Sequence, residues 1–579
     1  MAETLISPGV LARENDTSQV TSQPVQAGAA IIGPTVKGPV GIPTLVTTYS
    51  QYQQKFGTTF TSGSDSDILT YFTSIAAYNY FANGGTSLLV ARVVSGSYLP
   101  ANTNTIGNCI SGSAGAVNPV LVLETIAKGA DQNSSSSLDI SGSLLSGSAN
   151  NIRYQISNWN TSSGTFSLLI RRGDDNNLNI NPLETWTGLS LDPFSPNFVS
   201  KVIGDQAQTY VTDGTSYYLQ LTGSYVGASN YVRVKSVVTT PTYFDNNGAP
   251  KTQFTASIPI NQSGSFASAA GILGAASEYY DKIITTDKSQ GIPIAANNGQ
   301  GYPDMINLLS NRDDYRFNIL LAPGLFNSLQ TGLITNIISV AEDRGDFIFV
   351  NDLYTYGTTL PLVTAQATGR NTSYAASYWP WVQTQDPDSG RNVWVPASTV
   401  IGGVYAYNDR VAEPWFAPAG INRGGLQVIR AERRLSQTDR DTLYQNKVNP
   451  IATFPGQGVV VYGQKTLQTK ASALDRVNVR RLLIALKNYI SQVANNLVFE
   501  QNTTTTRNNF LAQVNPYLES VQQRQGLYAF KVVMDESNNT AADIDRNQLN
   551  GGIYVQPTKT AEFIYLDFNI TPTGATFPA

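Results

Sequence analysis

The hydrophobic pattern predicts an α/β layer assembled from two separate stretches of the chain. In the first stretch, residues 67–81 place apolar side chains at helical spacing, and residues 87–94 form an apolar run typical of a buried strand. In the second, strand-like runs at residues 316–321 and 346–350 flank a helical face at residues 329–341. This order of strand, helix and strand predicts two parallel strands joined by a right-handed crossover.

A stretch punctuated by glycine and proline precedes the first of these helices. Two short apolar runs, at residues 29–32 and 44–48, predict strands, and three Gly/Pro steps between them indicate a stiff, specifically shaped loop. The loop sequence GPTVKGPVG superficially suggests a phosphate cradle. It lacks the spacing of a P-loop, and its prolines remove backbone donors, so we interpret it as structural.

Between the two halves of the α/β layer, the chain changes character. Residues 96–264 are rich in serine, glycine and asparagine, and apolar residues alternate with polar ones at residues 151–156, 166–170 and 231–238. Alternation of period two is typical of half-buried strands. We therefore expect an all-β insertion on the surface of the α/β layer.

The C-terminal third contains the longest helical pattern in the chain. Ser472 and Asp475 have the spacing of a capping box, which predicts a helix start. An apolar stripe at helical spacing follows it. The stripe comprises Val479, Leu482, Leu486, Ile490, Val493 and Leu497.

Both ends of the chain differ from the bodies that they flank. The first 22 residues contain too few large apolar groups to form a core, and residues 562–570 form a strand pattern that is apolar on both faces. An extended segment of about 20 residues reaches on the order of 60 Å, which is enough to enter an adjacent subunit. The expected divisions are an arm at 1–22, a middle α/β domain at 23–95 and 265–370, the insertion at 96–264, a C-terminal α+β domain at 371–560, and an arm at 561–579.

The composition removes most familiar enzyme mechanisms. The 579 residues include no histidine and one cysteine. Without imidazole, Ser-His-Asp and Cys-His nucleophiles and almost every zinc or non-haem iron site are excluded. Cys109 has no second cysteine with which to form an intrachain disulfide.

Charge and hydropathy narrow the possible partners. The net charge of -4 provides no basic surface for nucleic acid, and no apolar run approaches the roughly 20 residues that span a bilayer. The N-terminal sequence lacks the features of a signal peptide, so we expect synthesis in the cytoplasm. Charged residues make up only 13% of the chain. Because hydroxyls and amides are less costly to desolvate than ions, such a surface favours burial against another subunit.

Candidate chemical groups favour no active site, cofactor or metal. The sequence DPDSG at residues 386–390 lacks ligands that a calcium loop needs, so we interpret it as a turn. Neighbouring carboxylates point apart, which disfavours glycoside hydrolysis and favours solvated loops. Four clustered tryptophans suit a core or an interface rim better than a sugar groove. These groups are Asp174 with Asp175, Asp313 with Asp314, Asp535 with Glu536, and Trp379, Trp381, Trp394 and Trp415.

Four stretches of the sequence resemble the tail sheath proteins of contractile-tailed bacteriophages. They are residues 31–57, residues 386–425 with an expected Gly-Val-Tyr-Ala turn, residues 449–467, and residues 526–574. Together they cover the chain from near its start to near its end, apart from the insertion. The chain departs from the family pattern at Tyr462, Lys465 and Met534, where relatives often show tryptophan, arginine and cysteine respectively.

The resemblance implies a structural protein without enzymatic activity. Such subunits polymerise helically, in stacked hexameric rings, around an inner tail tube between baseplate and tail terminator, and contract to drive the tube through the host envelope. A virion tail, assembled in the host cytoplasm, is the implied location. Two alternatives stay open, a tail adhesin or glycan-cleaving tail protein and an intracellular polymer unrelated to phage.

The resemblance also implies candidate interaction residues. In the family, terminal arms complete the sheet of a neighbour's C-terminal domain, and that domain faces the tube. The candidate strand-exchange residues are Leu5, Ile6, Val10, Phe563, Ile564, Tyr565, Leu566 and Phe568. The candidate tube-facing residues are Arg476, Arg480 and Arg481.

Overall fold

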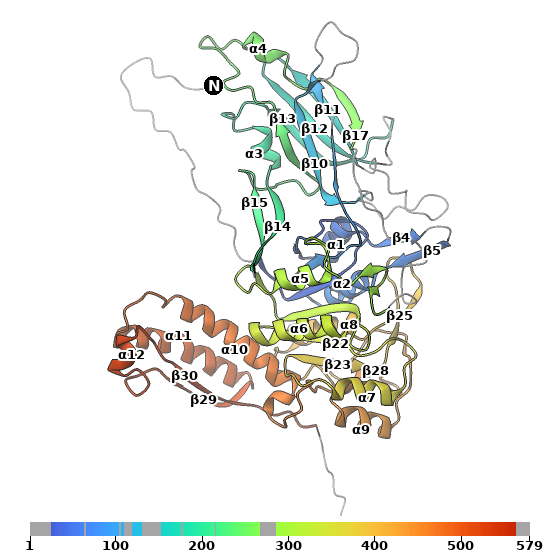
Figure 1. Ribbon diagram of the computed structural model, residues 1–579, viewed down its shortest axis with the longest axis vertical. Helices are drawn as coiled ribbons and strands as arrows, with labels where there is room; N and C mark the ends of the chain where they lie inside the picture. Colours follow the sequence, from blue (N-terminus) through green and yellow to red (C-terminus); the bar gives the residue numbers. More distant parts are fainter. Residues whose placement is uncertain are drawn as a thin grey trace, which may run out of the picture.

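The computed structural model shows an elongated molecule with a layered body at its centre (Figure 1). It describes residues 25–62, 65–103, 106–108, 118–129, 152–173, 175, 178–214, 216–266 and 285–562. The β insertion occupies one end of the long axis, and a smaller unit of helices and a hairpin lies beside the opposite end of the body.

An eight-stranded sheet forms the centre of the body. Its six inner strands are parallel, and an antiparallel strand closes each edge. In spatial order the strands are β28 (Gly458–Val461), β27 (Val448–Phe454), β23 (Ala375–Trp379), β22 (Ile348–Asp352), β21 (Ile319–Phe326), β2 (Ala29–Gly33), β6 (Leu88–Arg92) and β3 (Thr44–Val46).

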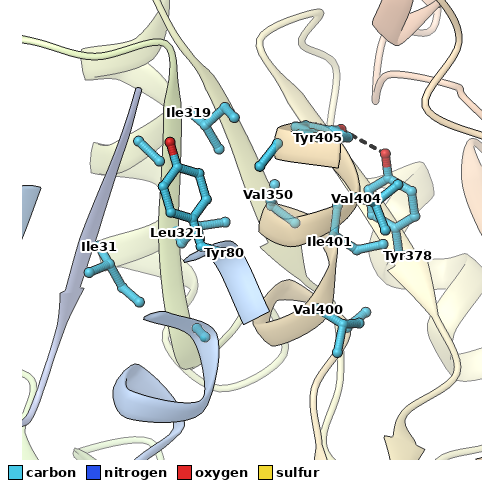
Figure 2. Close-up of a cluster of buried hydrophobic side chains, with 14 of the residues drawn as sticks. Ile31, Tyr80, Ile319, Leu321, Val350, Tyr378, Val400, Ile401, Val404 and Tyr405 are labelled. Carbon is cyan, nitrogen blue, oxygen red and sulfur yellow. Dashed lines mark hydrogen bonds between the residues drawn. The ribbon is translucent and has the colours of Figure 1, made fainter. Parts of the chain in front are cut away.

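Helices cover both faces of this sheet. The βαβ unit predicted for the second stretch is confirmed, because β21 and β22 pair in parallel and α6 (Thr331–Arg344) connects them. On the other face lie α2 (Phe72–Ala82) and α8 (Ser398–Val411) (Figure 2). Adjacent strand residues serve opposite faces, since Ile31 belongs to the apolar cluster that includes α2 and α8, while Ile32 belongs to the cluster that includes α6. Strands buried on both faces explain the continuous apolar runs.

Two glycines allow α8 to approach the sheet closely. A Cβ on Gly402 would lie 2.6 Å from Cδ1 of Leu321, and a Cβ on Gly403 would lie 2.6 Å from the carbonyl oxygen of Asn79 in α2. Any larger residue would push α8 away from both neighbours. The expected turn at Gly-Val-Tyr-Ala is therefore wrong, because these residues lie inside a buried helix.

Two expected helix starts are also wrong. Residues 65–70 form strand β5 (Asp65–Thr70), which pairs with β4 (Thr59–Ser62), so the helix begins only at Phe72. Ser472 caps a short 3-10 turn at residues 473–475, and the extended backbone of Arg476 separates this turn from α10 (Val477–Asn495). In both places a local pairing or cap delays the start of the helix that the apolar spacing predicted.

The insertion has a core of its own. Two sheets enclose one apolar cluster whose described members lie between Ala101 and Phe266. The first sheet has the order β16 (Val232–Val237), β10 (Leu121–Lys128) and β7 (Pro100–Asn102), and the second has the order β13 (Pro182–Ser190), β12 (Thr165–Arg172), β11 (Ile152–Asn160) and β17 (Gln262–Ser265). Asp175 is buried there, and Arg171 donates to its two carboxylate oxygens at 2.7 and 2.9 Å. The interpretation of this acid as part of a solvated loop is therefore wrong.

The hairpin of β14 (Ala207–Asp213) and β15 (Ser216–Thr222) extends from the insertion toward the body (Figure 1).

The C-terminal unit is smaller than the sequence suggested. It consists of α10, α11 (Thr504–Gln523), β29 (Leu527–Val533), α12 (Ala541–Asp545) and β30 (Gly552–Pro557). The central sheet continues through β23, β27 and β28, so it crosses the expected division between residues 370 and 371. That division needs correction, because the parallel pairing of β22 with β23 joins the two sides in one core.

A buried carboxyl at the start of α8 should make the stability of the fold depend on pH. Asp352 accepts hydrogen bonds from the backbone N–H and hydroxyl of Ser398, and burial raises its pKa to about 7 despite these bonds. Because this pKa is higher folded than unfolded, the stability that the carboxyl contributes declines as pH rises from about 4 to about 7. We expect Asp352→Asn to raise the thermal midpoint by several degrees at pH 8 and by less at pH 5.

Thermal unfolding followed by circular dichroism at both pH values measures this effect. Asp441→Asn is a matched control at an exposed position and should leave the midpoint unchanged. An equal effect of Asp352→Asn at both pH values would contradict the assignment.

Candidate assembly interface

The C-terminal unit presents a two-stranded sheet whose inner face packs on helices. The inward side chains of β29 and β30 join the apolar side chains of α10 and α11 in one cluster. On the outer face, Tyr528 and Tyr554 are 63% and 65% exposed. Within the described residues neither strand pairs with a third strand. Unpaired edges of this kind accept an additional strand from another chain.

Trp415 fixes the hairpin to the body. Its indole N–H donates to the carbonyl oxygen of Arg524 at 3.0 Å, and the guanidinium of Arg524 lies 5.1 Å from the ring centroid. Gly526, two residues later, leaves room for the ring, because a Cβ there would lie 3.2 Å from the indole. The tryptophan therefore holds the turn between α11 and β29 against the segment that leaves α8.

Two arginines at the start of α10 hold that helix to the body from inside. Arg481 donates to the carboxylate of Asp409, and its guanidinium lies 4.7 Å from the ring centroid of Tyr405. Arg480 lies 4.0 Å from the ring centroid of Tyr374. Burial alone would lower the pKa of Arg481. The Asp409 carboxylate outweighs burial, so the net pKa is raised and the ion pair is maintained.

This placement corrects the expected tube-facing role of these residues. Arg480 and Arg481 are each 4% exposed, within their own chain. A partner protein cannot reach guanidinium groups that are stacked on internal tyrosines. Arg476 pairs with Asp475 and Glu562 but is partly exposed, so its tube-facing role stays a prediction.

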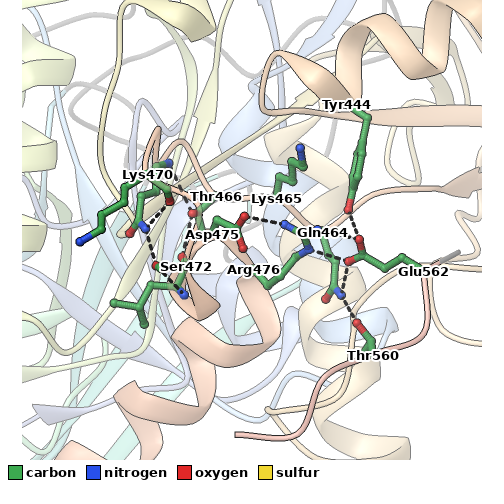
Figure 3. Close-up of polar contacts among 12 residues, drawn as sticks. Tyr444, Gln464, Lys465, Thr466, Lys470, Ser472, Asp475, Arg476, Thr560 and Glu562 are labelled. Atoms are coloured by element: carbon green, nitrogen blue, oxygen red, sulfur yellow. Dashed lines mark hydrogen bonds and ion pairs between the residues drawn. The ribbon is translucent and has the colours of Figure 1, made fainter.

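A polar cluster fixes the segment that leads to the C-terminal end (Figure 3). We name it the Glu562 cluster, and it comprises Tyr444, Gln464, Arg476, Thr560 and Glu562. Arg476 donates from Nε and Nη2 to the two carboxylate oxygens of Glu562 at 2.7 and 2.9 Å. Tyr444 donates to the same carboxylate at 2.7 Å, and Gln464 donates to it at 2.9 Å. Burial alone would raise the pKa of Glu562. These hydrogen bonds outweigh burial, so the net pKa is lowered.

Glu562 is the last described residue, so the cluster determines where the predicted C-terminal arm leaves the body. A cavity of about 550 Å³ lies beside it, lined in part by Ser472, Asn478 and Thr560. The carboxamide oxygen of Asn478 is buried without a hydrogen-bond partner among the described residues. The predicted strand-exchange residues Leu5, Ile6, Val10, Phe563, Ile564, Tyr565, Leu566 and Phe568 lie outside the described residues.

Two of the three departures from the family pattern, Lys465 and Tyr462, lie in the segment that contributes Gln464 to this cluster, whereas Met534 is buried in the C-terminal unit. The ammonium group of Lys465 is 4.5 Å from the ring centroid of Tyr444, and burial lowers its pKa. Tyr462 is 48% exposed and packs edge-to-face against Phe454, with the ring centroids 5.0 Å apart. Lysine places a positive charge against the tyrosine ring, but it cannot form the two parallel hydrogen bonds that an arginine could form with a carboxylate.

Two of the candidate tryptophans and the aspartates of the DPDSG turn make contacts inside the chain. Trp379 and Trp381 are 3% exposed, so they cannot line a sugar groove. Asp386 accepts hydrogen bonds from Thr70 and Ser389, while Gln53 donates to Asp388 at 2.9 Å. These aspartates join the turn to the first α/β stretch. Among the described residues no cluster of acids suits a metal ion, and no helix combines the length and apolar character needed to cross a membrane.

Sequence reasoning missed the residues that join the C-terminal unit to the body. Asp409, Trp415 and Glu562 each contact residues more than 60 positions away, and spacing along the chain gives no sign of such pairs. One signal was present for Glu562, which stands as a single acid directly before the apolar run.

Comparison with known proteins identifies relatives for the body and the C-terminal unit. Residues 298–467 match the model described as "Phage tail sheath protein central domain", and residues 469–571 match "Phage tail sheath C-terminal domain". The tail sheath protein of Vibrio phage KVP40 is 44% identical over 208 residues, which cover 36% of this chain and 31% of the relative. That of Enterobacteria phage T4 is 41% identical over 187 residues, covering 32% and 28%.

The structural likeness extends over more of the chain. A sheath tail protein from Listeria innocua superposes with a TM-score of 0.51 at 11% identity, covering 92% of this chain and 96% of that one. At this identity the likeness shows a shared fold. The sequence matches span about a third of the length of the curated phage relatives.

Reversing the charge of Arg481 tests whether its buried ion pair with Asp409 holds α10 to the body. We expect Arg481→Glu to destabilise the protein by about 3 kcal/mol or more, because it places two carboxylates together and leaves neither paired. Thermal unfolding measures this loss. Arg434→Glu, at an exposed position, is the matched control and should be nearly neutral. A stable Arg481→Glu variant would contradict the buried pair.

Neutralising Glu562 tests whether its cluster holds the C-terminal segment. We expect Glu562→Gln to weaken the cluster by about 1 kcal/mol, a value reduced for partial exposure, without changing the global midpoint. Trypsin should then cleave after the exposed Lys559 several times faster than in the unmodified protein. Glu536→Gln, an exposed control, should not change the rate. Equal cleavage in all three proteins would rule out an anchoring role.

Proposed function

We propose that this chain, whose residues 298–571 belong to the phage tail sheath family, is the subunit of a contractile tail sheath. The observation that carries the proposal is the adjoining match of two sheath models, joined with a sheath fold across 92% of the chain. The subunits form a helical polymer around an inner tail tube, and contraction drives the tube through the host envelope. The baseplate and a tail terminator are the proposed partners at the two ends of the sheath.

The open hairpin of the C-terminal unit supports an assembly by strand exchange. Its edges carry backbone groups without strand partners in the described part of the chain, and its outer face exposes tyrosines. We assign the terminal arms, which contain Leu5, Ile6, Val10 and the apolar residues after Glu562, to the hairpins of neighbouring subunits. Main-chain pairing tolerates modest rotation of the bodies that it connects, so subunits remain linked while they move.

Contraction then consists of repacking between bodies that stay internally rigid. Each further 100 Å² of apolar area removed from water contributes about 2.5 kcal/mol, and this contribution is repeated in every subunit. A head-to-tail contact between subunits that does not close into a ring repeats along a helix, so the polymer can grow to any length.

The burial of the tryptophans counts against the alternative of a glycan-binding tail protein. Trp379, Trp381 and Trp415 are at most 5% exposed and cannot stack on a saccharide. Negative-stain microscopy separates the two functions, because a sheath subunit gives striated tubes and an adhesin gives discrete particles.

Altering the N-terminal arm tests the mode of assembly. We expect a variant that lacks residues 1–19 to fold with an unchanged thermal midpoint and to form no tubes, because it loses the strand that links neighbours. Leu5→Asp with Ile6→Asp should act in the same way, since a charged strand does not fit an apolar hairpin edge. Thr4→Asp with Ser7→Asp adds equal charge to neighbouring polar positions and should preserve tubes. Normal tubes from the truncated protein would refute arm exchange.

A further inference from the structure

A cavity of about 590 Å³ lies between the insertion and the central body. Its lining includes the loop after β2, helix α1 (Tyr49–Phe56), strand β10 (Leu121–Lys128) and the hairpin of β14 and β15. This volume is within the range of small-molecule sites. The cavity is distant from the C-terminal unit and plays no part in the proposed strand exchange.

Three lysines line this cavity, and their backbones meet around one glycine. The backbone N–H of Lys37 donates to the carbonyl oxygen of Phe56 at 3.0 Å, and that of Lys128 donates to the carbonyl oxygen of Gly38 at 3.1 Å. A Cβ on Gly38 would lie 2.7 Å from the carbonyl oxygen of Lys55, so only glycine allows this approach. Lys37, Lys55 and Lys128 all line the cavity.

A buried arginine holds this arrangement in place. Nη1 of Arg92 donates to the carbonyl oxygens of Gly38 and Lys128, at 2.7 and 3.0 Å. Arg92 is 1% exposed. One cationic side chain therefore connects the loop of the body to the last residue of β10 in the insertion.

The charges that line the cavity do not balance. Glu124 is the one acid among the lining residues, and it already pairs with Arg233 and with Lys235. Within the described part of the chain, the ammonium groups of Lys55 and Lys128 have no hydrogen bond or ion pair. Burial lowers the pKa of both lysines, and Glu124 opposes this shift at Lys128. In a chain with few charges, such an excess of cations indicates a site that an anion completes.

We propose that this cavity binds a small phosphate-bearing anion, held by Lys55 and Lys128. Two ammonium groups on one cavity suit a multiply charged phosphate, which lysine binds as a point charge, better than a single carboxylate. Pro39, Ile42 and Ile126 supply an apolar wall that accommodates an organic group. Because Lys55 belongs to the body and Lys128 to the insertion, the bound anion cross-links the two.

Isothermal titration calorimetry on the full-length chain, at constant ionic strength, tests the proposal with inorganic pyrophosphate and with adenosine monophosphate. We expect saturable binding of at least one probe and a thermal midpoint that rises by several degrees at saturation. Tighter binding of pyrophosphate identifies a free phosphate as the ligand, and tighter binding of the monophosphate identifies an organic phosphate.

Matched variants test whether the anion binds at Lys55 and Lys128. Lys55→Gln with Lys128→Gln should weaken it at least tenfold, whereas Lys55→Arg with Lys128→Arg should keep it within about threefold because charge is preserved. Lys201→Gln with Lys470→Gln, at exposed positions, should leave it unchanged. Without ligand, the glutamine pair at 55 and 128 should not lower the thermal midpoint, since it relieves buried repulsion. Absence of binding to the unmodified protein, equal binding by the glutamine pair, or equal loss in the arginine pair would overturn the proposal.

Discussion

The close contact of α8 with the central sheet is the constraint on which the rest of the molecule depends. Gly402 and Gly403 let this helix lie directly against Leu321 and the backbone of α2. The same helix carries Tyr405 and Asp409, which hold Arg481 of α10, and the chain beyond it carries Trp415, which holds the C-terminal hairpin. One helix thus positions the sheet, the second layer and the C-terminal unit relative to one another.

This connection affects how the molecule transmits force. The C-terminal unit is joined to the body through buried ion pairs and aromatic stacking, and such contacts are costly to open because a buried charge would lose its partner. Large relative motion within one chain is therefore expensive. In the proposed sheath, movement is concentrated between chains, where extended arms connect rigid bodies and main-chain hydrogen bonds tolerate rotation.

The sequence predicts the parts of this fold that repeat a simple period. The run of β21, α6 and β22 follows from its spacing, because each strand is buried on both faces and α6 on one. Helix α8 does not follow, since it is buried on several sides and its two adjacent glycines suggest a turn. The roles of Arg480 and Arg481 were missed for a related reason. Charged side chains are usually exposed, and only tertiary contacts with Tyr374 and Asp409 reveal these two as internal.

The scarcity of surface charge has a structural origin in these same contacts. Among the described residues six arginines are at most 8% exposed, and they are spread over the body, the insertion and the C-terminal unit: Arg92, Arg171, Arg344, Arg480, Arg481 and Arg507. A chain with 13% charged residues that buries several of them leaves an exterior of hydroxyls, amides and aromatic rings. Desolvating such an exterior costs less than desolvating ions, so large contacts between copies form and rearrange without breaking many ion pairs. The lysine-lined cavity departs from this pattern, because its ammonium groups outnumber the acids around them.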